Sequence, residues 1–176
     1  QRQVVQLAID LAGTEHAGLG PHEVRAFDPL LSRVGGTEPA QLADFRLDLG
    51  LPVWSYSAGG VSLEKRVLLP HGQNTVQVTY RLVSGEGPVR LTLRPSVHFR
   101  PYEAPVDSEM ELTYTLVASR HGYELLSSAQ IPGLRLVTYG AKAALTLDAK
   151  GANAVPYQME ANRGYQSTGS LWSPGY

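Results

Sequence analysis

Five histidines are the residues of this chain best suited to acid–base or metal chemistry. They are far apart in sequence and form no HxH or HxxxH pair, so a metal site would have to assemble across strands. A surface or turn position is expected for most of them. His98 differs, because it lies on the polar face of a predicted strand beside Arg100 and near Tyr102, where it could meet a ligand. We expect no metal and no other cofactor.

Carboxylates are the second group to consider. Hydrolysis of a glycosidic bond needs two carboxyl groups about 5–9.5 Å apart, one of them with a raised pKa. The acidic residues that come close in sequence or share a strand face are Asp44, Asp48, Asp107, Glu109 and Glu111. None lies in an apolar stretch that would raise its pKa, so solvated charge is the expected role. There is also no cysteine, GxSxG element or phosphate-binding glycine loop, so no motif marks a catalytic residue.

A charged triplet, Glu64-Lys65-Arg66, interrupts an apolar strand pattern. Alternation places Glu64 and Arg66 on one face, where they could pair, and directs Lys65 to the apolar face. The expected explanation is an edge strand protected by lysine. The alternative is contact with a polar neighbour such as another domain.

Aromatic residues give the strongest indication of a binding surface, because sugars present apolar C–H faces that aromatic rings can cover. Trp54 and Tyr56 share a strand face and are expected in the core. Trp172 lies in a Ser/Gly-rich stretch without a strand pattern. It is therefore either a domain-interface anchor or a ligand platform.

The elements that must position these residues are strands, because apolar and polar residues alternate along much of the chain. Alternation is clearest over residues 76–82 and 88–100, which Gly85-Glu86-Gly87 would join as a hairpin. Further strands are predicted at residues 4–11, 45–49, 53–58, 63–69, 112–117, 123–126, 134–139, 143–147 and 155–160. Residues 15–40 are expected to form a long loop, and no window predicts a long amphipathic helix. The pattern predicts an all-β sandwich or barrel.

Length and composition favour a single domain over residues 1–176. The chain has 176 residues, of which 43% are apolar and 18% charged, and a formal net charge of -1. A chain of this size can bury about 70% of its unfolded surface. The charge balance disfavours a nucleic-acid partner, and no segment is typical of a membrane span or a signal peptide. The lack of cysteine excludes a disulfide scaffold and is compatible with a cytoplasmic location.

Several short motifs follow one another along the chain in a distinctive order. They are Phe45-Arg46-Leu47, Pro52-Val53-Trp54-Ser55-Tyr56, Leu63-Glu64-Lys65-Arg66-Val67, Pro70-His71-Gly72-Gln73-Asn74-Thr75, Tyr80-Arg81-Leu82, Gly87-Pro88-Val89-Arg90-Leu91, Leu93-Arg94-Pro95, Arg163-Gly164-Tyr165 and Leu171-Trp172-Ser173-Pro174-Gly175. In this order and spacing they resemble the N-terminal domain of bacterial and archaeal glycogen debranching enzymes of the amylo-α-1,6-glucosidase type. The resemblance extends from about Phe45 to Tyr176 and weakens between residues 112 and 156.

The resemblance implies an antiparallel β-supersandwich like those of galactose-mutarotase-like and glucoamylase-related domains. It implies an accessory domain that packs on a catalytic (α/α)6 barrel, which would follow Tyr176 and carry the catalytic carboxylates. No catalytic residue is then expected within the chain. Two loops would approach a bound α-glucan, and the candidate substrate-binding residues on them are His98, Arg100, Tyr102, Arg163 and Trp172.

Two other functions fit the residues. The first is a free-standing carbohydrate-binding module for α-glucans that uses Trp172 or Trp54, and it requires the isolated chain to bind malto-oligosaccharides. The second is a mutarotase-like enzyme with His98 or His121 and a carboxylate as acid and base. It requires such a pair within hydrogen-bond reach across strands.

Overall fold

The computed structural model has the antiparallel all-β sandwich fold that the alternation and the resemblance predicted. It describes residues 4–11, 41–58, 60–85, 91, 93–101, 104–109, 114–120, 122–127, 131–140 and 144–176. The strands within these residues are β1 (Val4–Leu11), β2 (Gln41–Asp48), β3 (Leu51–Ala58), β4 (Val61–Leu68), β5 (Thr75–Ser84), β6 (Thr115–Ser119), β7 (Gly122–Leu126), β8 (Leu134–Tyr139), β9 (Leu147–Pro156) and β10 (Thr168–Gly175). One short helix, α1 (Gln158–Asn162), lies between β9 and β10.

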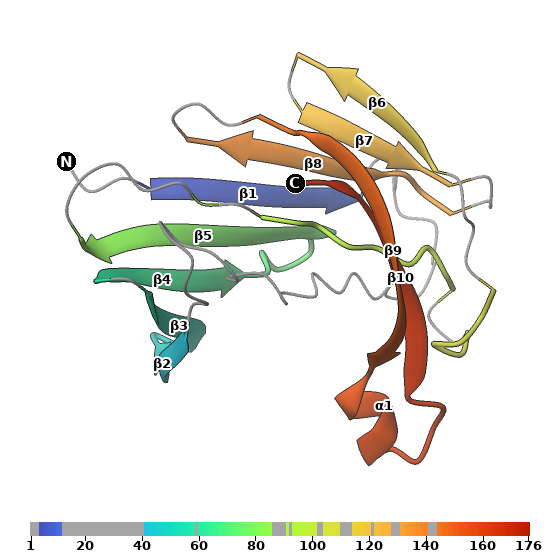
Figure 1. Ribbon diagram of the computed structural model, residues 1–176, viewed down its shortest axis with the longest axis horizontal. Coiled ribbons are helices and arrows are strands. Elements are labelled where there is room, and N and C mark those ends of the chain that lie inside the picture. The colour runs from blue at the N-terminus through green and yellow to red at the C-terminus, as the bar shows by residue number, and fades with distance from the viewer. Residues whose placement is uncertain are drawn as a thin grey trace.

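Eight of these strands form one antiparallel sheet in the order β2-β3-β4-β5-β1-β8-β7-β6 (Figure 1). The turn from β2 to β3 is Leu49-Gly50, with φ angles of 51° and 82°. Positive φ at both central positions is the geometry of a type I′ hairpin, which matches the twist of the flanking strands. β1 lies between β5 and β8 and pairs with both, so it joins the two halves of the sheet.

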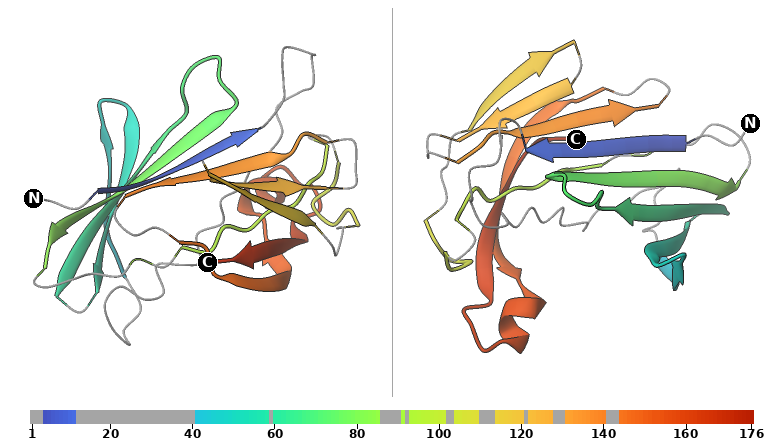
Figure 2. Two further views of the ribbon diagram at one scale, coloured as in Figure 1. Left: turned by 90° about the horizontal axis from the view of Figure 1, so that it is seen from above. Right: turned by 180° about the vertical axis from the view of Figure 1, so that it is seen from behind.

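A smaller second layer lies across one face of this sheet. It consists of the β9–β10 ribbon and the segment 93–101, which a backbone bridge between Val97 and Trp172 holds together. The ribbon crosses the end of the sheet that carries β8 and β7, whereas β2 and β3 lie at the other end (Figures 1 and 2). α1 lies at the far end of the ribbon (Figure 1). The second layer therefore covers one end of the sheet more fully than the other.

Strand register sorts the side chains onto two faces. Most of the apolar residues lie on the face toward the second layer, which we call the inner face, whereas the buried Val53 lies on the opposite face. Directly opposed residues share a face, as Leu63 and Leu82 do across β4 and β5. The main core cluster joins β7 and β8 to the second layer and consists of Val97, Leu125, Leu134 and Leu136. A second cluster joins the ribbon to the loop at Val106 and consists of Val106, Val155, Tyr157 and Leu171.

Gly169 in β10 allows the loop at Val106 to lie directly against the ribbon. A Cβ atom on Gly169 would stand 2.1 Å from the carbonyl oxygen of Val106, which is closer than any real contact. Only glycine permits this approach, and Val106 is accordingly 2% exposed.

The structure confirms several predicted strands and corrects others. The strand at 134–139 is β8 as predicted, but residues 93–100 form a single bridge at Val97, because Pro95 has no N–H to donate to a ladder. The predicted strand at 155–160 is wrong beyond Pro156, since α1 begins at Gln158 with residues that favour helix. Residues 144–146 precede β9 instead of forming a strand of their own. The predicted loop at 15–40 and the turn at 86–87 lie outside the described residues.

The tail around Trp172 was not predicted as a strand, yet it forms β10. Its register with β9 contains two irregularities, between Gly169 and Leu171 and between Ser173 and Gly175. Both shifts place their extra residue in β9, so β10 itself still alternates. Its buried positions include Gly169 and Ser173 besides Leu171, so the sequence shows little of the apolar alternation of a strand.

Candidate functional site

Parts of the two predicted sugar-facing segments meet in the second layer. Val97 and Trp172 exchange both backbone hydrogen bonds, with N···O distances of 2.7 and 2.9 Å. His98 follows Val97 directly and is therefore held beside β10. Arg163 lies away from this contact. It is an exposed residue directly after α1, and α1 lies at the far end of the ribbon (Figure 1). Tyr102 lies outside the described residues.

Trp172 packs between the layers as part of an aromatic row. Its ring centroid is 4.6 Å from that of Tyr114 at an interplanar angle of 51°, and Tyr114 is 5.3 Å from Phe99. Trp172 and Phe99 both pack against the main core cluster. Tilted aromatic pairs of this kind add to the energy of area burial. The indole thus anchors the second layer to the sheet, and its stacking on a sugar stays a prediction.

His98 is half-buried, and its two ring nitrogens are shielded from water. Among the residues that the structure describes, neither nitrogen has a hydrogen-bond partner. Burial lowers the pKa of His98, and the neighbouring Arg100 guanidinium lowers it further. His98 is therefore neutral at pH 7, and an unpartnered buried polar group costs about 1–3 kcal/mol. No carboxylate contacts it among the described residues, as the mutarotase hypothesis would need, and His121 lies outside them.

Arg100 is buried, with 9% of its surface exposed, and its side chain makes a hydrogen bond to a nearby backbone group. Its Nη1 donates a hydrogen bond to the carbonyl oxygen of Ala104. This contact closes the loop that continues to Val106 over the ribbon. Because it holds this loop, Arg100 has a structural role here, and a contact with sugar hydroxyls stays a prediction.

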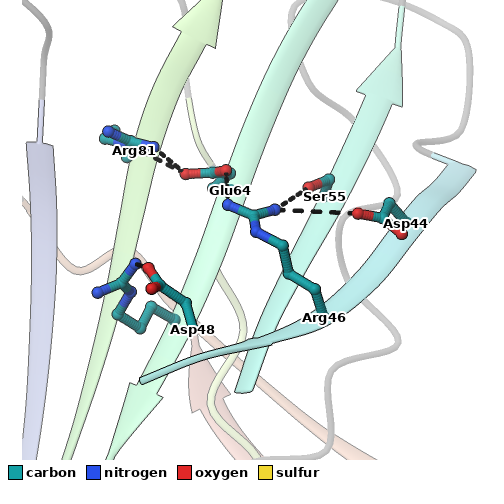
Figure 3. A network of polar contacts seen from close by, with 7 residues as sticks. Asp44, Arg46, Asp48, Ser55, Glu64 and Arg81 are labelled. Carbon is teal, nitrogen blue, oxygen red and sulfur yellow. Dashed lines mark hydrogen bonds and ion pairs between the residues drawn. The ribbon is translucent and has the colours of Figure 1, made fainter. Parts of the chain in front are cut away.

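A network of ion pairs that the sequence did not reveal lies on the outer face of the sheet, opposite the inner face (Figure 3). Glu64 on β4 accepts hydrogen bonds from Arg46 on β2 and from Arg81 on β5, the latter at 3.0 Å from Nε. Arg46 also donates to the Ser55 hydroxyl at 3.2 Å and lies 3.9 Å from an Asp44 oxygen. The network ties four adjacent strands together.

The charged triplet therefore has a different explanation from the one expected. β4 lies between β3 and β5, so it is not an edge strand. Glu64 and Arg66 do share the outer face, but Arg66 pairs with Asp48 instead of Glu64. The register that places Glu64 opposite Arg81 is the signal that could have predicted the network, and it depends on how β4 and β5 align.

A second group of charges joins the segment 93–101 to β9. Arg94 donates to the backbone carbonyl of Asp148 at 2.8 Å and also binds the Asp148 carboxylate, which lies 3.0 Å from Lys150 Nζ. Lys150 and then Arg94 lower the pKa of Asp148. The Arg94 guanidinium also lies over the Tyr176 ring at 5.5 Å. These contacts hold the second layer together.

The described residues contain no group of three or more His, Asp or Glu side chains that could hold a metal ion. No helix among them is long and apolar enough to cross a membrane. Asp107 and Glu109 are exposed, as expected of solvated charges, and Glu111 lies outside the described residues.

Comparison with known proteins places the chain in a family. Residues 33–176 match the family model described as the N-terminal part of glycogen debranching enzyme. This region includes β2 to β10, and hence the outer-face network and the second layer. No curated protein and no solved structure matches the chain significantly. The match covers well over half of the sequence, and the chain therefore belongs to the glycogen debranching enzyme N-terminal domain family.

Proposed function

We propose that this chain is the accessory N-terminal domain of a cytoplasmic amylo-α-1,6-glucosidase that debranches glycogen. It packs on a catalytic (α/α)6 barrel and contributes loops to the binding of the α-glucan. The family match over residues 33–176 is the observation that carries the proposal.

The electrostatics of the described carboxylates support an accessory role. A glycosidase acid needs a raised pKa so that it is protonated before it acts. Hydrogen bonds from Arg46 and Arg81 lower the pKa of Glu64, and Lys150 and Arg94 lower that of Asp148. Both carboxylates are thus held ionised by basic partners, which suits a structural ion pair and not a general acid.

The exposed Arg163 is the candidate residue best placed to reach outward to a glucan. It lies on the surface after α1, in the segment that links α1 to β10. The backbone N–H of Arg163 donates to the carbonyl oxygen of Glu160 at 3.1 Å, so the side chain can change without disturbing that contact. His98, Arg100 and Trp172 are more deeply embedded, and they would act by holding the loops in place.

The test measures glucose release from phosphorylase-limit dextrin. The longer debranching enzyme that contains this chain should release glucose, and residues 1–176 alone should not. In the longer enzyme, Arg163→Ala should raise KM for limit dextrin several-fold with little change in kcat, because it removes binding remote from the reaction. Arg120→Ala, at the exposed turn after β6, is the matched control and should change neither constant.

Glucose release by residues 1–176 alone would overturn the proposal, and equal kinetics for the two arginine variants would remove the glucan-contacting role. Calorimetry of residues 1–176 with maltoheptaose tests the carbohydrate-binding module instead. Binding by the isolated chain, in a protein without debranching activity, would favour that function.

A further inference from the structure

The apolar side chains on the inner face of the sheet become more exposed toward β2. Leu63 on β4 is 5% exposed, whereas Phe45 and Leu47 on β2 are 52% and 67% exposed. Trp54 on β3 is intermediate. Leu42, also on β2, is 58% exposed. We call Leu42, Phe45, Leu47 and Trp54 the open patch.

Register shows that the open patch continues the core. Phe45 lies opposite Trp54, and their ring centroids are 5.4 Å apart. Trp54 lies opposite Lys65, which in turn lies opposite the buried Tyr80. These residues therefore share the inner face with the buried residues of β4 and β5. Leu91, which precedes the segment 93–101, packs against the cluster at Val61 and Leu63, and this cluster includes no residue of β2.

Apart from Val53, which lies opposite Arg46 and Arg66 and is fully buried, the outer face of the same strands is polar and charged. There Arg46, Glu64 and Arg81 pair with one another, and Arg66 pairs with Asp48. An apolar patch backed by a polar, charge-paired face is the pattern of a sheet with one side meant for burial. A contiguous apolar patch of this kind marks an interaction site.

We propose that an apolar segment of the debranching enzyme's own polypeptide, from outside residues 1–176, packs on the open patch and extends the second layer over β2 and β3. This inference rests on the proposed function, because it requires a longer enzyme.

Size favours a tethered occupant over a second copy of the chain. From its residue sizes the open patch is on the order of 400 Å². A stable dimer buries about 800 Å² on each partner. A segment of the same polypeptide needs less area, since it loses far less translational freedom on docking than a separate molecule does.

Chemistry disfavours a sugar as the occupant. Among the described inner-face positions of β2 to β5, Lys65 is the one charged residue, and its Nζ lies 5.4 Å from the Trp54 ring centroid. A sugar site needs several convergent polar groups to bind hydroxyls. The exposed leucines of β2 instead match an apolar side-chain surface.

The test is hydroxyl-radical footprinting read by mass spectrometry, on residues 1–176 and on the longer enzyme. Phe45 should be oxidised at least fivefold more slowly in the longer enzyme. Tyr139, which is 55% exposed and thus matches Phe45, should change less than twofold. Phe45→Ser in the longer enzyme should restore oxidation at Trp54. If residues 1–176 do not fold alone, the ratio of Phe45 to Tyr139 oxidation is compared between the native and the urea-unfolded longer enzyme, with the same fivefold decrease expected.

Equal oxidation of Phe45 in the two proteins would overturn the inference. So would protection in residues 1–176 alone that grows with protein concentration, which indicates a second copy, or protection that requires maltoheptaose, which indicates a sugar. Debranching activity is measured on the same samples. An active longer enzyme with an unprotected Phe45 contradicts this inference alone, whereas an inactive one contradicts the proposed function.

Discussion

Trp172 offers the sharpest test of how the second layer is held. We expect Trp172→Ala to destabilise the fold, because the ring packs against Tyr114 at 4.6 Å and against the main core cluster. Replacing a fully buried Trp by Ala costs about 3–5 kcal/mol, and the half-buried site reduces this to roughly 2–3 kcal/mol. Loss of the aromatic pair adds about 0.5–1.5 kcal/mol. The expected total is about 3 kcal/mol.

Urea unfolding followed by circular dichroism measures this change, and thermal unfolding should show Tm lowered by about 6–12 °C. Trp172→Phe keeps an aromatic ring beside Tyr114 and should lose only about 1 kcal/mol. Trp54→Ala is the matched control. It removes the same side chain next to the exposed Phe45, where less packing is lost, and should cost about 1–2 kcal/mol.

A ligand platform would behave differently, because such a ring can be removed without loss of packing. If Trp172→Ala unfolds within about 1 kcal/mol of the unmodified chain, the anchoring role is wrong. A loss of glucan binding at unchanged stability would then assign the indole to the sugar instead.

Three further predictions test the register, the network and the buried histidine. Leu125→Ala should lower the free energy of unfolding by about 3–4 kcal/mol, because Leu125 is fully buried. Leu126→Ala should lower it by under about 1 kcal/mol, because the neighbouring Leu126 is 37% exposed. Similar losses for the two variants in urea unfolding would contradict the assigned faces. Glu64→Gln should cost about 1–2 kcal/mol, since it weakens two ion pairs with partly exposed arginines, and the loss should shrink in 1 M NaCl; a salt-independent loss would show that packing dominates. His98 has a lowered pKa in the folded chain, so its contribution to stability is complete above its ordinary pKa of about 6.5 and is lost as the pH falls below that value. The free energy of unfolding measured from pH 5 to 8 should therefore depend less on pH in His98→Asn, and identical slopes would refute the burial of this ring.

Alternation in the sequence was enough to predict the strands and their faces where neighbours are local. Val78 and Tyr80 point inward and Arg81 outward because successive side chains of a strand point to opposite sides. The helix at Gln158–Asn162 escaped prediction, because five residues are too few for a helical period to show. The break at Pro95 was visible as a residue type, but its effect depended on which partner the strand would need.

The candidate site was predicted less completely than the fold. Sequence reasoning placed His98 and Arg100 on one segment and Trp172 on another, and the structure joins the two through Val97. The burial of the His98 ring and of the Arg100 guanidinium was not foreseen, since both depend on what lies above them.

The sequence by itself determined that the chain is all-β, which side chains share a face in regular strands such as β5, and to which family the chain is similar. Strand order was decided only in three dimensions, where β1 pairs with β8 across more than a hundred residues of chain. The same holds for the pairing of Glu64 with Arg46 and Arg81, which depends on the alignment of separate strands. The physical reason is that alternation is a local property of the backbone, whereas pairing and coverage are chosen by the free energy of the whole assembled sheet.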